Sequence, residues 1–111
     1  MLEREIQKQC LKCMHMKGIY CWRNNTAGIY NKKSGGYFFH GLAGVSDILG
    51  ILPQECSHGL QGVFIAVEVK TPKGIVSDAQ RAFLGQIEAR GGLALVVHSV
   101  DELEQRLQDF L

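Results

Sequence analysis

The feature that most constrains the fold is residues 62–70, which the alternation of side chains predicts to be a β-strand. The odd-numbered side chains of this segment are valine or isoleucine, and the even-numbered ones stay apolar until Glu68. A strand that is apolar on both faces is typical of the centre of a sheet covered on both sides. The rest of the chain must therefore supply neighbouring strands and helices for both faces.

The remaining pattern predicts those elements. Apolar residues at steps of three and four predict a helix over residues 2–17, ended by Gly18. Further strands are expected at residues 19–23, 37–40, 45–52 and 93–98, with helices over 77–90 and 100–110. Pro53 is expected to end its strand, residues 54–61 to form a surface connection, and the polar, glycine-rich residues 26–36 a hairpin tip or mobile loop.

This order, α-β-β-β-α-β-α, predicts one α/β domain over residues 1–111, with a mixed sheet of about four to five strands flanked by helices. A chain of 111 residues has room for one such core, and 46% hydrophobic with 21% charged residues is typical of a globular protein. No apolar run approaches the roughly 20 residues of a membrane span. The first five residues lack the apolar segment of a signal peptide, so we expect a cytoplasmic protein.

Cysteine spacing raises the question of a zinc site. Cys10 and Cys13 form a C-x-x-C pair, but both lie within a helical pattern, and Cys21 and Cys56 supply no second pair. We interpret the cysteines as core-facing thiols.

Charge is divided unevenly along the chain. Residues 1–36 carry seven basic and two acidic residues, a net of +5, whereas residues 37–111 carry five basic and nine acidic residues, a net of −4. A basic amino-terminal third is compatible with a polyanionic partner. No glycine-rich phosphate loop or dinucleotide fingerprint is present, which argues against a small-molecule enzyme.

Three ionisable residues fall where the pattern predicts burial. Glu68 and Lys70 leave the same face of the central strand, and Asp47 lies within another apolar strand. If these strands are antiparallel neighbours, Asp47 and Glu68 converge, and Glu3, on the inward stripe of the first helix, would be a third acid. Two or three carboxylates with open positions suit Mg²⁺ or Mn²⁺.

Lys70 beside such an ion could orient a water or neutralise charge that develops on a phosphate, and Gln80 could hydrogen-bond the same water or phosphate. The alternative is that Glu68 and Lys70 form an ion pair at a solvated strand end while Asp47 caps a turn. The combination of all these residues favours the metal site.

The same residues carry a resemblance to a known family. Glu3, Arg23-Asn24-Asn25, Gly44-Val45-Ser46-Asp47-Ile48, Ile65-Ala66-Val67-Glu68-Val69-Lys70 and Ser77-x-x-Gln80 together resemble the virus-type replication-repair nuclease (VRR-NUC) domain. That family belongs to the restriction-endonuclease-like superfamily with the PD-(D/E)xK motif, in the branch similar to Holliday junction resolvases. The resemblance implies a restriction-endonuclease-like core.

It also implies roles for individual residues. Asp47 and Glu68 match the metal-binding acids, with the Val69 carbonyl as a further ligand, and Lys70 matches the catalytic lysine. Glu3 matches the acid of the first helix and Gln80 the motif glutamine. The expected cofactor is Mg²⁺, with Mn²⁺ as a substitute. One departure is visible, because Ser46 stands where the motif has its proline.

The candidates for contact with DNA phosphates flank these acids: Arg23, Asn24, Lys32, Lys33 and Lys73. Lys32 and Lys33 are equally compatible with a solubilising pair on a loop. The aromatic residues near that loop, Tyr30, Tyr37, Phe38 and Phe39, either stack on exposed bases or, as we favour, pack against protein. The four histidines have no ligand spacing, and we expect structural roles for them.

By analogy with the resolvase-like branch, we expect a homodimeric, Mg²⁺-dependent endonuclease of bacterial or phage origin that acts on branched DNA. One alternative keeps the chemistry and changes the substrate: a flap, nicking or duplex-specific nuclease. Another is a catalytically inactive DNA-binding module, against which the intact Asp47, Glu68 and Lys70 argue.

Overall fold

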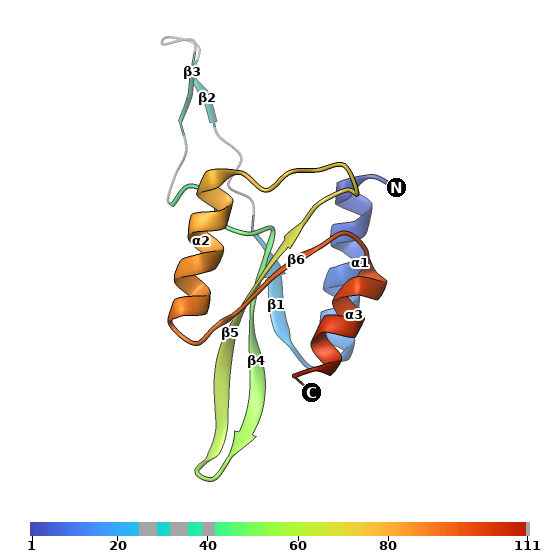
Figure 1. Cartoon of the computed structure of the whole chain (residues 1–111), viewed down its shortest axis with the longest axis vertical. Coiled ribbons are helices and arrows are strands. Elements are labelled where there is room, and N and C mark those ends of the chain that lie inside the picture. Colours follow the sequence, from blue (N-terminus) through green and yellow to red (C-terminus); the bar gives the residue numbers. More distant parts are fainter. Residues whose placement is uncertain (25–28, 32–35, 39–41, 111) are drawn as a thin grey trace.

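Three helices and a central sheet form three layers (Figure 1). The computed structural model describes residues 1–24, 29–31, 36–38 and 42–110. The helices are α1 (Glu3–Met16), α2 (Asp78–Ala89) and α3 (Val100–Gln108). The strands are β1 (Tyr20–Arg23), β2 (Ile29–Asn31), β3 (Gly36–Phe38), β4 (Ile48–Cys56), β5 (Gly59–Val69) and β6 (Leu93–Val97).

The main sheet has the strand order β1-β4-β5-β6, with β5 antiparallel to β4 and parallel to β6. Helices α1 and α3 cover one face, and α2 lies on the other (Figure 1). The predicted α/β class, the mixed sheet and the element order are therefore confirmed, and β5 is the central strand that the sequence predicted, although its Phe64 is 37% exposed.

The core lies between the sheet and the α1–α3 layer. Buried residues of α1, such as Ile6 and Met14, pack there with Ile65, Val67 and Val69 of β5. Helix α1 ends where predicted, because Gly18 adopts a φ of +80° that favours glycine. Three of the four cysteines are buried thiols, as interpreted, and only Cys56 is exposed.

The prediction that Pro53 ends its strand is wrong. β4 runs on to Cys56 and forms a long hairpin with β5, in which Pro53 pairs with Gly62 and Cys56 with Gly59. The pairing of β1 with β4 stops at Ile51, so β4 is an edge strand at Pro53. A proline is tolerated there because its missing N–H has no partner to lose. Figure 1 shows this hairpin extending beyond the helices.

A second, two-stranded sheet is formed by β2 and β3, so the expected hairpin is present, but β2 lies within residues 26–36, where no strand was expected. Lys32, Lys33, Phe39 and His40 lie outside the described residues. On helix α2, Leu84 is buried, whereas Ala79 and Ala82 are exposed. They line a groove of about 410 Å³ together with Phe83 and Ile87.

No helix in the described part of the chain is both long enough and apolar enough to cross a membrane.

Candidate active site

Three polar residues line up across the sheet where β1 and β4 meet the end of β5. The strand register ends with Arg23 opposite Ile48 and Ile48 opposite Val67, so the next row is Asn24, Asp47 and Glu68. The backbone N–H of Asn24 donates to the carbonyl of Asp47 at 2.7 Å, which continues the ladder by one residue. Paired residues share a face, and this row faces the α2 side, opposite the Ile48–Val67 core side. The predicted convergence of Asp47 and Glu68 is therefore present.

Glu68 is the most deeply buried acid in this row, with 1% of its surface exposed. Burial raises the pKa of Glu68 to about 9, and the neighbouring carboxylate of Asp47 raises it further, because its negative charge disfavours an ionised Glu68. Lys70 lowers this pKa, and Glu3 raises it by its negative charge. Ionised Glu68 is thus costly unless a positive charge accompanies it.

The backbone around Glu68 is fixed on both sides. Oδ2 of Asp47 accepts a hydrogen bond from the N–H of Val69 at 2.7 Å. The N–H of Lys70 donates to the carbonyl of Val97 on β6 at 2.9 Å. The E-x-K segment is therefore held between β4 and β6, which places the Val69 carbonyl between the side chains of Glu68 and Lys70 along the chain.

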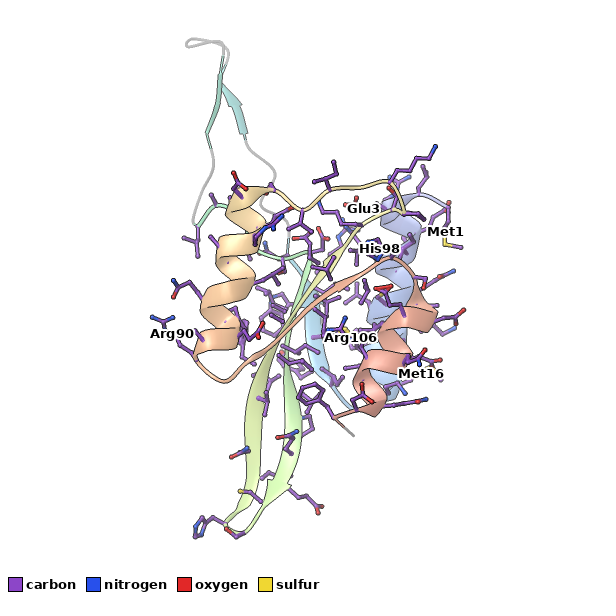
Figure 2. The ribbon with its side chains drawn as sticks, viewed as in Figure 1. Met1, Glu3, Met16, Arg90, His98 and Arg106 are labelled. Carbon is purple, nitrogen blue, oxygen red and sulfur yellow. The ribbon has the colours of Figure 1, made fainter. Side chains whose placement is uncertain are left out.

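Glu3, the first residue of α1, is half-buried and close enough to act on the charge of Glu68. Figure 2 shows it at the end of α1 that lies toward the segment following β5. The interpretation of Glu3 as an inward acid agrees with this position.

The loop before Asp47 rests on the first turn of α2. A Cβ atom on Gly44 would lie 2.2 Å from the carbonyl oxygen of Ala79, and the φ of Gly44 is +80°. Only glycine fits such an approach without moving one of the two segments. Gly44 thus couples the Asp47 loop to the amino terminus of α2.

The motif glutamine lies in that same turn of α2. Gln80 Oε1 accepts a hydrogen bond from the N–H of Ser77 at 2.9 Å, and Ser77 Oγ accepts one from the N–H of Gln80 at 3.1 Å. These two bonds form a capping box that starts α2 at the predicted serine. Gln80 therefore holds the helix terminus through Oε1, which leaves Nε2 as its group for a water or a phosphate.

Lys70 is followed by a tight turn in which the N–H of Gly74 donates to the carbonyl of Thr71 at 2.8 Å. A Cβ atom on Gly74 would lie 3.3 Å from both Cβ and Cδ of Lys70, so the turn packs on the methylene stem of the lysine. Lys73, within the turn, is exposed, as is Arg23 at the end of β1. Both candidate phosphate contacts are thus open to a ligand.

Sequence reasoning missed how many buried polar groups lack partners here. Among the described residues, the buried side-chain atoms without a hydrogen-bond partner are Asn24 Nδ2, Ser46 Oγ and both carboxylate oxygens of Glu68. All four atoms belong to the Asn24–Asp47–Glu68 row or to its neighbour Ser46. Buried polar groups are normally satisfied, so such a cluster indicates a site for an ion, water or substrate. Ser46 has no sequence signal beyond its place before Asp47.

The donor set fits a hard divalent cation. Two carboxylates with a nearby carbonyl suit Mg²⁺, which binds few protein oxygens and keeps several waters. A cation between Asp47 and Glu68 would also compensate the two orphaned oxygens of Glu68. In the described part of the chain, no three Cys, His, Asp or Glu side chains converge as a ready metal cluster, so Glu3 lies near the acid pair without completing one.

The mixed four-stranded sheet with three helices is consistent with a restriction-endonuclease-like fold, and an acid pair followed by a lysine lies at one end of its strands. The chain belongs to the VRR-NUC family: the model of the VRR-NUC domain matches residues 3–101, most of the chain. This membership identifies a nuclease domain with DNA as its substrate. No curated protein and no solved structure gave a match to the chain.

Proposed function

We propose that this protein is a Mg²⁺-dependent endodeoxyribonuclease that hydrolyses phosphodiester bonds in branched DNA as a homodimer. The observation that carries the proposal is Glu68, a carboxyl 1% exposed, with two orphaned oxygens and a carboxylate neighbour in Asp47. Burying a carboxyl without partners destabilises the fold, so such groups gather at functional sites. Compensation of the Glu68 charge by a cation during phosphodiester hydrolysis is a function of this kind.

Asp47 and Glu68 would hold the ion, with the Val69 carbonyl as a third protein ligand and Mn²⁺ as a substitute. When bound, the ion supplies Lewis-acid activation of a phosphoryl oxygen and lowers the pKa of a water. Lys70 stabilises the negative charge that grows on the phosphate as the water oxygen bonds to phosphorus and the bond to the leaving sugar oxygen breaks. Gln80 and Glu3 contribute to the site from α2 and α1.

Arg23, Asn24 and Lys73 would contact backbone phosphates on either side of the acids, and Lys32 and Lys33 would extend that contact. Phosphate contacts of this kind position DNA without reading its sequence. Preference for branched DNA then requires that the protein recognise the shape of the branch. A two-fold dimer matches the symmetry of a four-way junction.

The test is cleavage of labelled four-way, flap and linear DNA of the same sequence, with Mg²⁺ or with a chelator. We expect cleavage of the four-way junction that the chelator abolishes. Lys70→Ala should lose this cleavage and still bind junction DNA, whereas Lys12→Ala, which removes the same charge from the exposed side of α1, should keep it.

The alternatives give other results. Equal cutting of linear duplex contradicts the junction preference, and preferred cutting of the flap favours a flap nuclease. Binding without cleavage by the unaltered protein, with either Mg²⁺ or Mn²⁺, favours an inactive DNA-binding module.

A further inference from the structure

The sheet face that carries the active site is only partly covered. Helix α2 packs against β5 and β6 on this face and leaves β1 and β4 open. Tyr20 is 74% exposed, Trp22 41%, Ile51 43% and Phe64 37%. The rings of Tyr20 and Trp22 lie 5.8 Å apart between centroids. These four side chains form one uncovered patch.

The strand register shows that the patch is continuous. Tyr20 pairs with Ile51, and Ile51 pairs with Phe64, so the three form a row on one face. The next row is Trp22, Leu49 and Ala66, and the row after it is the Asn24–Asp47–Glu68 row of the site. The apolar patch therefore runs directly into the catalytic row.

In the other direction the patch continues along the β4–β5 hairpin. Pro53 and Leu60 alternate onto the same face, and Leu60 is 74% exposed. The opposite face of the hairpin carries Gln54, Cys56 and Gln61 instead. Apart from Glu55 opposite Leu60, this face of the hairpin is apolar, and exposed apolar surface of this kind is typical of a face that another protein covers.

We propose that this face, defined as Tyr20, Trp22, Ile51, Pro53, Leu60 and Phe64, binds the same face of a second copy of the chain. We name it the dimer face. The two-fold axis runs parallel to the strands, between the two packed sheets. This proposal specifies the interface of the homodimer named in the proposed function. Only the direction of the two-fold axis depends on that proposed function.

The area of the dimer face suits such a partner. A full aromatic side chain offers 150–250 Å², so the exposed fractions add to roughly 500 Å² of apolar surface per molecule. A standard interface buries about 800 Å² on each partner, of which somewhat more than half is apolar. From Ile51 to Pro53 the face carries no charged residue; Glu55 lies opposite Leu60 at the far end of the hairpin, where it is exposed.

The direction of the axis follows from where the acids lie. A two-fold axis along the strands leaves the catalytic ends of both sheets pointing the same way, whereas an axis across the strands would separate them to opposite ends. It also places the open β1 edge of each copy beside α2 of the other, because α2 stands over β5 and β6 only. Both active sites then face one DNA branch.

The first experiment measures mass by sedimentation velocity, without DNA or metal. The chain of 12.3 kDa should sediment at twice that mass at micromolar concentration. Ile51→Glu places an uncompensated charge at the centre of the dimer face and should raise the dimer dissociation constant by about a hundredfold. Gln54→Glu, which adds the same charge to the polar face of the hairpin, should change it less than about threefold.

Trp22 gives a second readout, because it is the only tryptophan in the chain. Dilution of the dimer should shift its emission to longer wavelength as its ring returns to water, with the same midpoint as the loss of mass. A monomer at every concentration, or a dimer that Gln54→Glu breaks and Ile51→Glu does not, would overturn the proposal.

Cross-linking keeps the test decisive if Ile51→Glu fails to fold. With the exposed Cys56 replaced by serine, Ile51→Cys should form a disulfide-linked dimer on mild oxidation, and Gln54→Cys should not. The reverse result contradicts the dimer face. An inactive dimer with this pattern supports the interface and contradicts the nuclease proposal, whereas an active monomer overturns the interface alone.

Discussion

Oδ2 of Asp47 accepts a hydrogen bond from the backbone N–H of Val69 at 2.7 Å, so an acid at the start of β4 is attached to the backbone that follows Glu68. One carboxylate oxygen of Asp47 is engaged in this way, and Oδ1 remains for other contacts. The bond fixes the position of Asp47 relative to the backbone beside Glu68, which is the preorganisation that the proposed ion site requires.

Asp47→Asn should therefore separate the position of this side chain from its charge, because the amide oxygen can still accept the Val69 N–H. We expect cleavage to fall by at least about a hundredfold. The pKa of Glu68 should move down toward its ordinary value, since the repelling charge is gone. Carboxyl NMR titration measures the pKa, and Asp78→Asn on the exposed first turn of α2 is the matched control.

Stability without divalent cations should decrease as the pH rises. The pKa of Glu68 is about 9 in the folded chain against 4.5 as the ordinary value, so the folded state binds the extra proton between these values. The stabilisation is full below about pH 4.5 and is lost as the pH rises through about 9. Thermal unfolding in a chelator measures this, and Glu68→Gln should remove its part of the slope. An identical slope in both proteins would contradict the assignment.

Gly44→Ala should destabilise the fold more than a left-handed backbone alone explains. Gly18 has the same φ of +80° with no atom within 4 Å of its added Cβ, so Gly18→Ala reports only the backbone cost, about 1 kcal/mol. Gly44→Ala adds the collision with the Ala79 carbonyl and should cost at least about 2 kcal/mol more. Denaturant unfolding of the pair gives the difference, and equal losses would show that the Gly44–α2 contact is loose.

Substitutions of Gln80 should distinguish its capping role from its proposed catalytic role. Gln80→Ala removes the acceptor for the Ser77 N–H and should lower stability by about 0.5–2 kcal/mol. Gln80→Glu keeps an acceptor oxygen and should restore that stability. If Nε2 of Gln80 serves the reaction, Gln80→Glu will cleave as slowly as Gln80→Ala. Full activity in Gln80→Glu would restrict the residue to the cap.

Much of this architecture could be predicted because the strongest signals are local. The alternation over residues 62–70 defined β5 and its two faces, and Gly18 and Ser77 marked helix termini correctly. The extension of β4 past Pro53 could not be foreseen, because it depends on the pairing of β1 with β4 stopping at Ile51, which is a property of the sheet.

The two acids of the candidate site could be predicted from the sequence, whereas the surrounding residues that position them could not. Asp47 and Glu68 stand out because each interrupts an apolar strand, and their opposition then follows from the register. The contact of Gly44 with Ala79 joins segments distant in the sequence, and glycine gives no sign of which atom it will meet. The contact of Gly74 with Lys70 is local and depends on the turn closed between Thr71 and Gly74. The orphaned Ser46 hydroxyl is visible only once its surroundings are packed.

The distribution of thiols has a practical consequence for all these measurements. Burial raises the pKa of Cys10 to about 12 and also raises the pKa values of Cys13 and Cys21. Thiolates are the reactive form, so a maleimide dye at neutral pH will attach to Cys56 alone, at the opposite end of β4 from Asp47. The unaltered chain can thus carry one fluorophore at a known place, remote from Asp47 and Glu68.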